Sequence, residues 1–186
     1  MRIISGLFKG KSINFIKNSK TRPLKDSVRE NIFNILKHSK LININIENSK
    51  ILDLYAGVGS FGLESISRGA KMVTFIERDK NTGNILKENL NKLSIINKFK
   101  FINNNIETAL ESGLNEKFNI FFLDPPFLDN KFIQILNLIK RNNIYETKHI
   151  IIIHRERESK DNFENNIKII LTKKYGRSKI LFGLFS

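Results

Sequence analysis

The stretch that decides the fold is ILDLYAGVGSFG, residues 51–62. Its first half is an apolar run of strand length, and its second half has the composition of a helix start. Gly57, Gly59 and Gly62 stand between them with the spacing G-x-G-x-x-G. Glycine at these positions permits a tight turn, a close approach of a ligand to the backbone and close packing of helix on strand. The stretch therefore predicts a nucleotide-binding strand–turn–helix.

An acidic residue stands at the expected distance from this turn. Glu77 lies 20 residues after Gly57 at the end of the next predicted strand, where a carboxylate can accept both ribose hydroxyl protons. We expect a bound adenosine cofactor, with Tyr55 and Ala56 also among the residues that hold it. The turn alone does not separate NAD from S-adenosylmethionine. Asp53 favours the latter, because it could face a cationic amino group and would repel a pyrophosphate.

Strands and helices alternate from residue 50 onward. The expected strands are 51–55, 72–76, 98–103, 118–123 and 148–154, and the expected helices are 60–69, 79–93, 106–112 and 129–141. Two further apolar runs, 167–175 and 179–185, close the chain as a hairpin. Repeated strand–helix units predict a Rossmann-like α/β fold. Its sheet has seven strands, mostly parallel, with helices on both faces and an antiparallel C-terminal edge.

The first 40 residues precede this pattern. Two short apolar stretches, 2–4 and 12–16, flank a glycine-containing turn and predict a small β-hairpin. A helix is expected from Ser27 to His38, with Ser27 and Glu30 at capping-box spacing. We expect one domain over 1–186, with 1–40 as an extension of a catalytic core at 50–186.

The strongest chemical signal is Asp124-Pro125-Pro126-Phe127, which directly follows an apolar strand. Two prolines fix the direction of the chain and leave the Pro125 carbonyl pointing outward beside the Asp124 carboxylate. These two acceptors would form a cradle for an exocyclic amine, and Phe127 could stack on the base that carries it. The four residues are the predicted catalytic set.

Such a cradle suits methyl transfer to a nucleobase amine. The lone pair of that amine is delocalised into the ring, and two hydrogen bonds from its N–H groups favour a pyramidal nitrogen. Because the sulfonium of S-adenosylmethionine is already a reactive methyl donor, positioning and electrostatics can supply most of the acceleration.

The positive charge of the chain is unevenly distributed. The formal net charge is +14, and residues 1–50 carry eleven basic and three acidic side chains. Ile, Asn and Lys make up 77 of the 186 residues, so part of the basicity reflects composition alone. Compositional drift should distribute basic residues evenly along the chain, whereas the excess positive charge is concentrated in residues 1–50. A clustered basic surface predicts a polyanionic partner.

Several classes of protein are excluded. The chain has no cysteine, which excludes disulfide scaffolds, thiolate metal sites and cysteine nucleophiles. It has neither an apolar run of membrane-spanning length nor a signal-peptide pattern, so we expect a soluble cytoplasmic protein without a metal. His38, His149 and His154 lack ligand spacing and are interpreted as structural. Residues 155–158 (RERE) are interpreted as a solvated mixed-charge segment.

The sequence resembles S-adenosylmethionine-dependent amino-methyltransferases, whose fourth strand ends in Asp/Asn-Pro-Pro-aromatic. More specifically, it resembles the bacterial ribosomal small-subunit methyltransferase D family, which methylates the N2 amine of a guanine in 16S rRNA. The matching segments are RIISG (2–6), KGK (9–11), TRP (21–23) and DSVRENIFN (26–34), followed by the motifs above in order and spacing. The resemblance covers nearly the whole chain.

The resemblance implies a role for each matching position. The turn residues and Glu77 would hold S-adenosylmethionine, and Asn105 would contact its adenine. Asp124 and Pro125 would bind the guanine amine. The residues that would contact RNA are Arg2, Lys9, Lys11, Arg22 and Arg29. The partner would be 16S rRNA or a small-subunit assembly particle, with the protein acting as a monomer.

Two positions depart from the family pattern, and two alternatives stay open. Val58 replaces the usual Thr or Ser between the glycines, and Leu24 replaces the usual Thr after Arg-Pro. The cradle itself would equally accept the N6 amine of adenine in DNA or another RNA. A non-catalytic RNA-binding module on the same fold is the other alternative.

Overall fold

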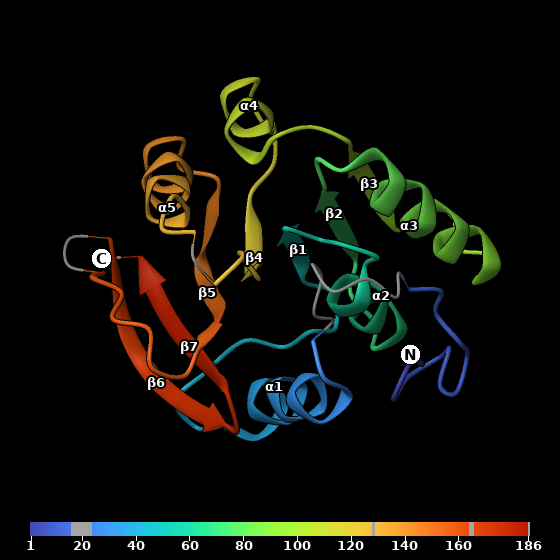
Figure 1. Ribbon diagram of the computed structural model, residues 1–186, viewed down its shortest axis with the longest axis horizontal. Helices are drawn as coiled ribbons and strands as arrows, with labels where there is room; N and C mark the ends of the chain where they lie inside the picture. Colours follow the sequence, from blue (N-terminus) through green and yellow to red (C-terminus); the bar gives the residue numbers. More distant parts are fainter. Residues whose placement is uncertain (16–23, 128, 164–165, 186) are drawn as a thin grey trace.

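The computed structural model describes residues 1–15, 24–127, 129–163 and 166–185. Seven strands form one sheet in the order β3-β2-β1-β4-β5-β7-β6 (Figure 1). The strands are β1 (Lys50–Leu54), β2 (Met72–Ile76), β3 (Phe99–Ile102), β4 (Phe118–Leu123), β5 (Tyr145–Glu156), β6 (Ile167–Tyr175) and β7 (Ser178–Phe185). The helices are α1 (Asp26–His38), α2 (Ser60–Ser67), α3 (Lys80–Lys92), α4 (Ile106–Glu111) and α5 (Phe132–Arg141).

The sheet confirms the predicted fold class. Strands β1 to β5 pair in parallel, and β7 pairs antiparallel with both β5 and β6. Strand β5 is longer than expected, because its first residues, 145–147, precede the apolar run that predicted it. The chain moves outward from β1 to β3 and then returns to β4 on the other side of β1. The carboxyl ends of β1 and β4 therefore flank the point where the strand order reverses, which is where such sheets bind ligands.

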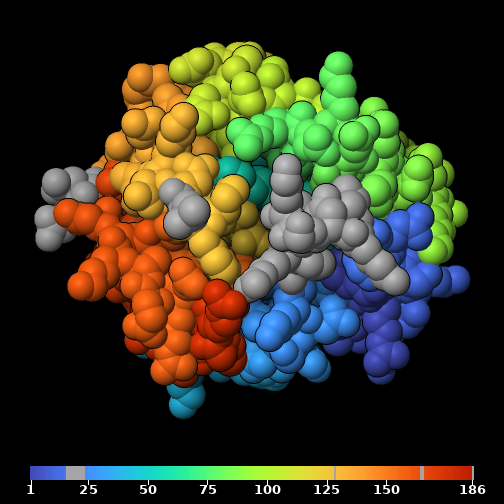
Figure 2. Space-filling model, viewed as in Figure 1, coloured from blue at the N-terminus to red at the C-terminus, as the bar shows by residue number. Residues whose placement is uncertain are grey.

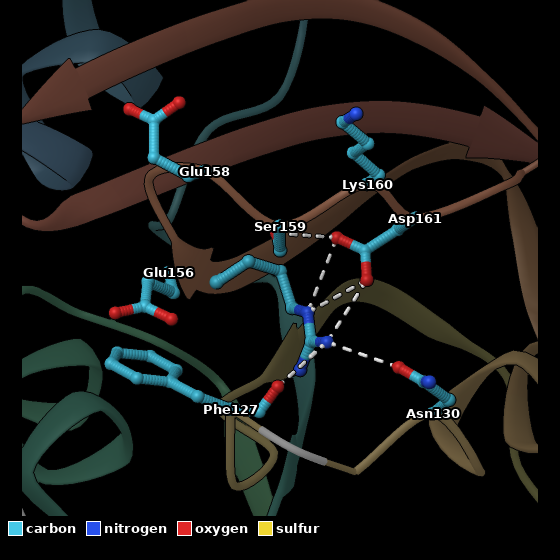
Figure 3. A pocket seen from close by; sticks show the side chains of 8 residues that line it. Phe127, Asn130, Glu156, Glu158, Ser159, Lys160 and Asp161 are labelled. Carbon is cyan, nitrogen blue, oxygen red and sulfur yellow. Dashed lines mark hydrogen bonds and ion pairs between the residues drawn. The ribbon is translucent and has the colours of Figure 1, made fainter.

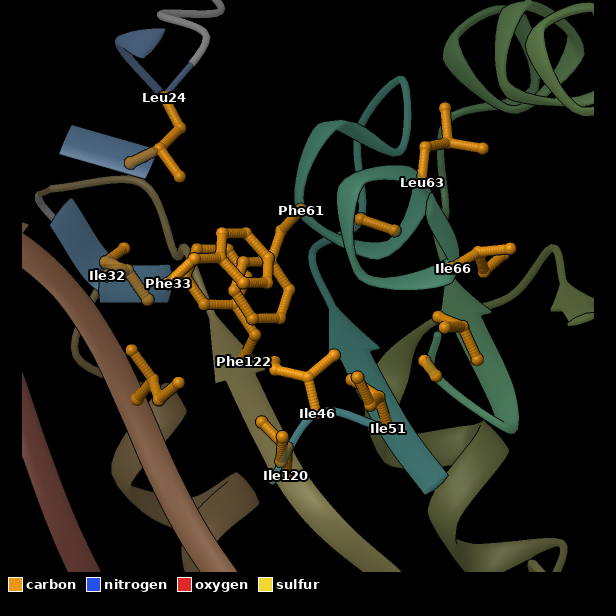
Figure 4. Packing of buried hydrophobic residues seen from close by; sticks show 14 of the residues in the cluster. Leu24, Ile32, Phe33, Ile46, Ile51, Phe61, Leu63, Ile66, Ile120 and Phe122 are labelled. Atoms are coloured by element: carbon orange, nitrogen blue, oxygen red, sulfur yellow. The ribbon is translucent and has the colours of Figure 1, made fainter. Parts of the chain in front are cut away.

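Alternate residues of the central strands face two separate apolar layers. On one face α1, α2 and α3 pack on the sheet, and on the other α4 and α5 do. A stack of three aromatic rings joins the first layer: Phe61 lies 5.1 Å from Phe33 and 4.0 Å from Phe122, between ring centroids (Figure 4). Since Phe122 belongs to β4, this stack supports the strand that Asp124 directly follows.

The N-terminal segment is more irregular than the predicted hairpin. Its regular pairing is a single antiparallel bridge between Arg2 and Ser12, supported by backbone hydrogen bonds such as Ile3 N to Lys11 O at 2.9 Å. The capping prediction for the following helix is wrong. Helix α1 begins at Asp26, and Lys25 precedes it without a side-chain cap, so Ser27 lies inside the first turn.

His149 on β5 makes the stability sensitive to acid. The ring is buried, donates from Nδ1 to the Glu146 carbonyl at 2.8 Å and accepts at Nε2 from the Phe185 amide at 3.0 Å. Burial lowers the pKa of His149 below its ordinary value of 6.5. Only the neutral ring can accept from Phe185.

We therefore expect the free energy of unfolding to fall as the pH falls below about 6.5. There the unfolded chain takes up a proton that the folded ring resists, at about 1.4 kcal/mol per pH unit until the folded pKa is reached. His149→Phe should retain the ring packing on Phe185 and remove this contribution. Urea unfolding between pH 5 and 8 measures it, and equal slopes for the two proteins would contradict it.

Candidate active site

The glycine turn after β1 adopts the conformation that its sequence predicts. Gly57 and Gly59 have positive φ angles of 57° and 86°. At Gly62 a Cβ atom would lie 2.2 Å from the ring of Phe75, so helix α2 can approach the sheet this closely only with glycine there. At Gly57 an added Cβ would meet only the Tyr55 carbonyl at 4.0 Å, so a ligand can approach the backbone of the turn.

Asp53 supports the turn from inside. Its side chain is buried and Oδ2 accepts a hydrogen bond from the Gly62 amide at 3.0 Å. Burial raises the pKa of Asp53 well above its ordinary value, and the negative charges of Asp124 and Glu77 raise it further. The Asp53 carboxyl group therefore holds the first turn of α2, and its contact with a cofactor amino group stays a prediction.

Glu77 lies at the turn, as its spacing predicted. Its Oε2 accepts from the Gly57 amide at 2.9 Å and its Oε1 from the Asp79 amide at 2.8 Å. Tyr55 and Ala56 connect β1 to the same turn, and burial raises the pKa of the Tyr55 hydroxyl, which stays un-ionised. Asn105 precedes α4 as an exposed residue.

Asp124 to Phe127 extend β4 beyond the sheet. Leu123 pairs with Ile153 of β5, so Asp124 emerges beside His154. The Asp124 side chain is 23% exposed, Pro125 is buried, and Phe127 is half-buried with its ring edge-on to His154 at 5.6 Å. In Figure 2 the segment after β4 (gold) lies beside a recess in which the β1–α2 region (teal) is visible. The structure thus brings the predicted catalytic segment and the glycine turn to one edge of the sheet.

Arg155 is a site residue that the sequence reasoning missed. Its guanidinium is buried, pairs with Asp161 at 2.9 Å, and donates to the carbonyl oxygens of Pro126 at 3.2 Å and Phe127 at 3.1 Å. Arg155 lines a cavity of about 320 Å³ together with Phe127 and Asp161, which are labelled in Figure 3. The interpretation of 155–158 as solvated is therefore wrong for Arg155. In the sequence, the position of Arg155 directly after the apolar run 148–154 was the signal that could have indicated its burial.

His154 is the second missed residue. Its Nδ1 lies 2.8 Å from Asp124 Oδ1, and its Nε2 lies 2.9 Å from Ser178 Oγ. Asp124, His154 and Ser178 are far apart in the sequence, and no spacing pattern connects them. His154 and Arg155, which are consecutive residues of β5, therefore bind different parts of the catalytic segment. His154 bonds to the Asp124 side chain, and Arg155 bonds to the carbonyl oxygens of Pro126 and Phe127.

The N-terminal segment docks on α2 through two polar side chains. Glu64 is fully buried and accepts from the amides of Ile4 at 2.8 Å and Ser5 at 3.0 Å. Ser67 Oγ donates to the Ser5 carbonyl at 2.6 Å and accepts from the Phe8 amide at 2.9 Å. The segment is thereby fixed to the helix that begins at the glycine turn.

The predicted RNA-contacting residues have different environments. Arg2, Lys9 and Lys11 are exposed on the N-terminal segment. Arg29 is fully buried, where it pairs with Asp26 at 3.0 Å and donates to the Arg2 carbonyl at 2.6 Å, so its assignment as an RNA contact is wrong. Arg22 lies outside the described residues.

Two kinds of feature are absent from the part of the chain that the structure describes. None of its helices combines the length and the apolar composition needed to cross a membrane. No cluster of three or more His, Asp or Glu side chains there could hold a metal ion.

Known proteins are similar to this chain in both sequence and fold. The family described as conserved hypothetical protein 95 matches residues 1–183. The ribosomal RNA small subunit methyltransferase D of Haemophilus influenzae is 36% identical over 160 residues, which cover 85% of this chain and 80% of that protein. The chain belongs to the ribosomal small-subunit methyltransferase D family. The Escherichia coli member is 32% identical over 86% of this chain and 76% of its own length.

Solved structures agree with the family assignment. The Escherichia coli protein yhhF superposes with a TM-score of 0.84 at 27% identity and covers all of this chain and 98% of its own. A Haemophilus influenzae protein described as a methylase superposes with a TM-score of 0.79 at 31% identity and the same coverage. The predictions of the family, the fold class and methyltransferase activity are confirmed.

Proposed function

We propose that this chain transfers a methyl group from S-adenosylmethionine to the exocyclic N2 amine of a guanine in 16S rRNA. The observation that carries the proposal is the position of Asp124 and Pro125 at the sheet edge that also holds the glycine turn. The relatives named above as small-subunit rRNA methyltransferases support the choice of substrate. The protein would act in the cytoplasm as a monomer, on 16S rRNA or on an assembly particle.

The residues at the turn fit the cofactor. The open backbone at Gly57 accepts a ligand without a side chain in the way, and Glu77 beside it supplies carboxylate oxygens for ribose hydroxyls. The carboxyl groups of Glu77 and Asp124 lie near enough to that of Asp53 to raise its pKa. Such a region favours a cationic ligand over an anionic one. S-adenosylmethionine supplies a methyl group on a positively charged sulfur.

The chain's own residues position the amine. Asp124 and the Pro125 carbonyl accept its two N–H groups, and among the described residues no donor is bonded to that carbonyl. The nitrogen gains the methyl group, the electron pair of the broken carbon–sulfur bond stays on sulfur, and one amine proton leaves to the Asp124 carboxylate. Phe127 stacks on the guanine, and Arg155 holds the carbonyls that orient Phe127.

The basic N-terminal segment would contact the RNA backbone. Arg2, Lys9 and Lys11 are exposed, and residues 1–50 carry more than half of the excess positive charge. Phosphate contacts of this kind supply affinity without reading sequence.

Nucleoside analysis tests the proposal. The protein is incubated with labelled S-adenosylmethionine and either 16S rRNA or small-subunit particles from cells that lack the gene, and the RNA is then digested. We expect label in N2-methylguanosine, and the better substrate identifies naked RNA or particle. Duplex DNA is included as a matched substrate. Label in N6-methyladenine instead would favour the adenine alternative, and no label in any nucleoside would contradict the proposal.

A further inference from the structure

Three strands each contribute one side chain to a continuous hydrogen-bonded chain at the site. Asp124 follows β4, His154 lies near the end of β5, and Ser178 begins β7. The distances are 2.8 Å from Asp124 Oδ1 to His154 Nδ1 and 2.9 Å from His154 Nε2 to Ser178 Oγ. The His154 side chain is 8% exposed, so protein atoms rather than solvent determine its orientation.

The direction of these hydrogen bonds follows from the groups involved. An ionised carboxylate can only accept, so the proton on the ring must be at Nδ1. The Nε2 atom of a neutral ring is then an acceptor, and the Ser178 hydroxyl donates to it. The Asp124 carboxylate thus fixes the tautomer, and the Ser178 hydroxyl completes the arrangement by a hydrogen bond to Nε2. One carboxylate oxygen is occupied in this way. Within the ranges that the structure describes, no donor is bonded to the other oxygen, which is left for a substrate.

The packing around the ring restricts it further. The ring of Phe127 meets His154 edge-on, with ring centroids 5.6 Å apart and planes at 81°. A rotation of the imidazole would break both hydrogen bonds and this contact. Asp124 has no comparable support from its own strand, because β4 ends at Leu123.

We propose that His154, oriented by Ser178, is a positioning residue that fixes the Asp124 carboxylate for methyl transfer. The inference rests on the proposed function, because it assumes that Asp124 holds the substrate amine. His154 itself does not touch the substrate in this scheme. It turns one oxygen of Asp124 toward the amine and prevents the side chain from rotating, and misplacement of a reacting group by about 1 Å can cost about 10²-fold in rate.

Two variants of the same position separate positioning from packing. His154→Asn retains an N–H donor close to the place of Nδ1, whereas His154→Leu retains volume without a donor. We expect kcat to fall about 10- to 100-fold in His154→Leu, with the KM for S-adenosylmethionine and the affinity for RNA changed less than about 2-fold. His154→Asn should recover most of the lost kcat. His38→Asn, at an exposed histidine of α1, is the matched control and should change nothing.

A cycle with Asp124→Ala shows whether the effect passes through Asp124. In that background His154→Leu should cause little further loss, since the carboxylate it positions is gone. Wild-type kcat in His154→Leu, or equal losses in the Leu and Asn variants, would overturn the proposal. An inactive wild-type protein would instead contradict the proposed function.

Nitrogen NMR of the histidine ring gives a readout that does not depend on activity. We expect the Nδ1–H tautomer in the wild-type protein and a mixture of tautomers in Asp124→Ala, where the carboxylate that fixes the proton at Nδ1 is removed. An Nε2–H tautomer in the wild type would overturn the inference even if methylation is observed.

Discussion

Asp124→Ala is expected to reduce methyl transfer by about 10²- to 10³-fold or more, because it removes an acceptor aimed at the reacting amine. The same change removes the group that takes the amine proton. The side chain is partly exposed, and its hydrogen-bond partner among the described residues is His154, so the fold should be retained. Single-turnover methylation of RNA measures the rate, and thermal unfolding confirms the fold.

The isosteric variant Asp124→Asn refines this prediction. Its one remaining oxygen must serve both His154 and the substrate, so its rate should lie between those of the wild type and Asp124→Ala. Glu158→Ala is a suitable control, because Glu158 lines the neighbouring cavity and its side chain is 80% exposed. Near wild-type activity in Asp124→Ala would contradict the assignment of this carboxylate to the reaction.

Glu64→Ala is expected to destabilise the protein by about 3–5 kcal/mol, the usual cost of breaking a buried charged cluster. Glu64 accepts from two amides of the N-terminal segment and from Arg68 Nε at 2.7 Å, and its Oε2 lies 3.8 Å from Arg29 Nε. Its loss leaves the buried Arg29 with less compensation. Since small domains are stable by about 5–15 kcal/mol, this is a large fraction of the total.

Urea unfolding measures the loss, and hydrogen exchange locates it. We expect the amides of residues 1–15 to lose protection first in Glu64→Ala. Glu88→Ala, at an exposed glutamate of α3, should change the stability by less than about 0.5 kcal/mol. Equal stability of the Glu64→Ala and Glu88→Ala proteins would show that the buried cluster does not hold the segment.

The sequence was sufficient for the sheet and for the glycine turn because both are local patterns. Strand–helix alternation determines the class of sheet. The spacing from Gly57 to Glu77 predicted their proximity because the two residues follow the ends of two neighbouring parallel strands. Asp124 could be identified for the same reason, because a proline pair directly after a predicted strand is a local sequence pattern.

The surroundings of the site could not be predicted in this way. Arg29 and Arg155 are charged residues that the fold buries, and their partners, Glu64 and Asp161 among others, come from other elements or loops. Charge in a sequence indicates exposure only on average. His154 reaches Asp124 through the register of β4 on β5, and Ser178 through that of β5 on β7, which no local spacing reveals.

The length of α2 has a consequence for how chains of this family can diverge. The helix carries the glycine turn at one end and Glu64 and Ser67, which hold the N-terminal segment, toward the other. An inserted residue rotates everything beyond it by about 100° and advances it by about 1.5 Å. One such insertion within α2 would separate the basic segment from its two anchors. Residues 39–49 lie in no helix or strand, and a change of length at an exposed position there, such as Leu41, would leave both anchors in place. Insertions and deletions should therefore accumulate in that connector and be absent from α2.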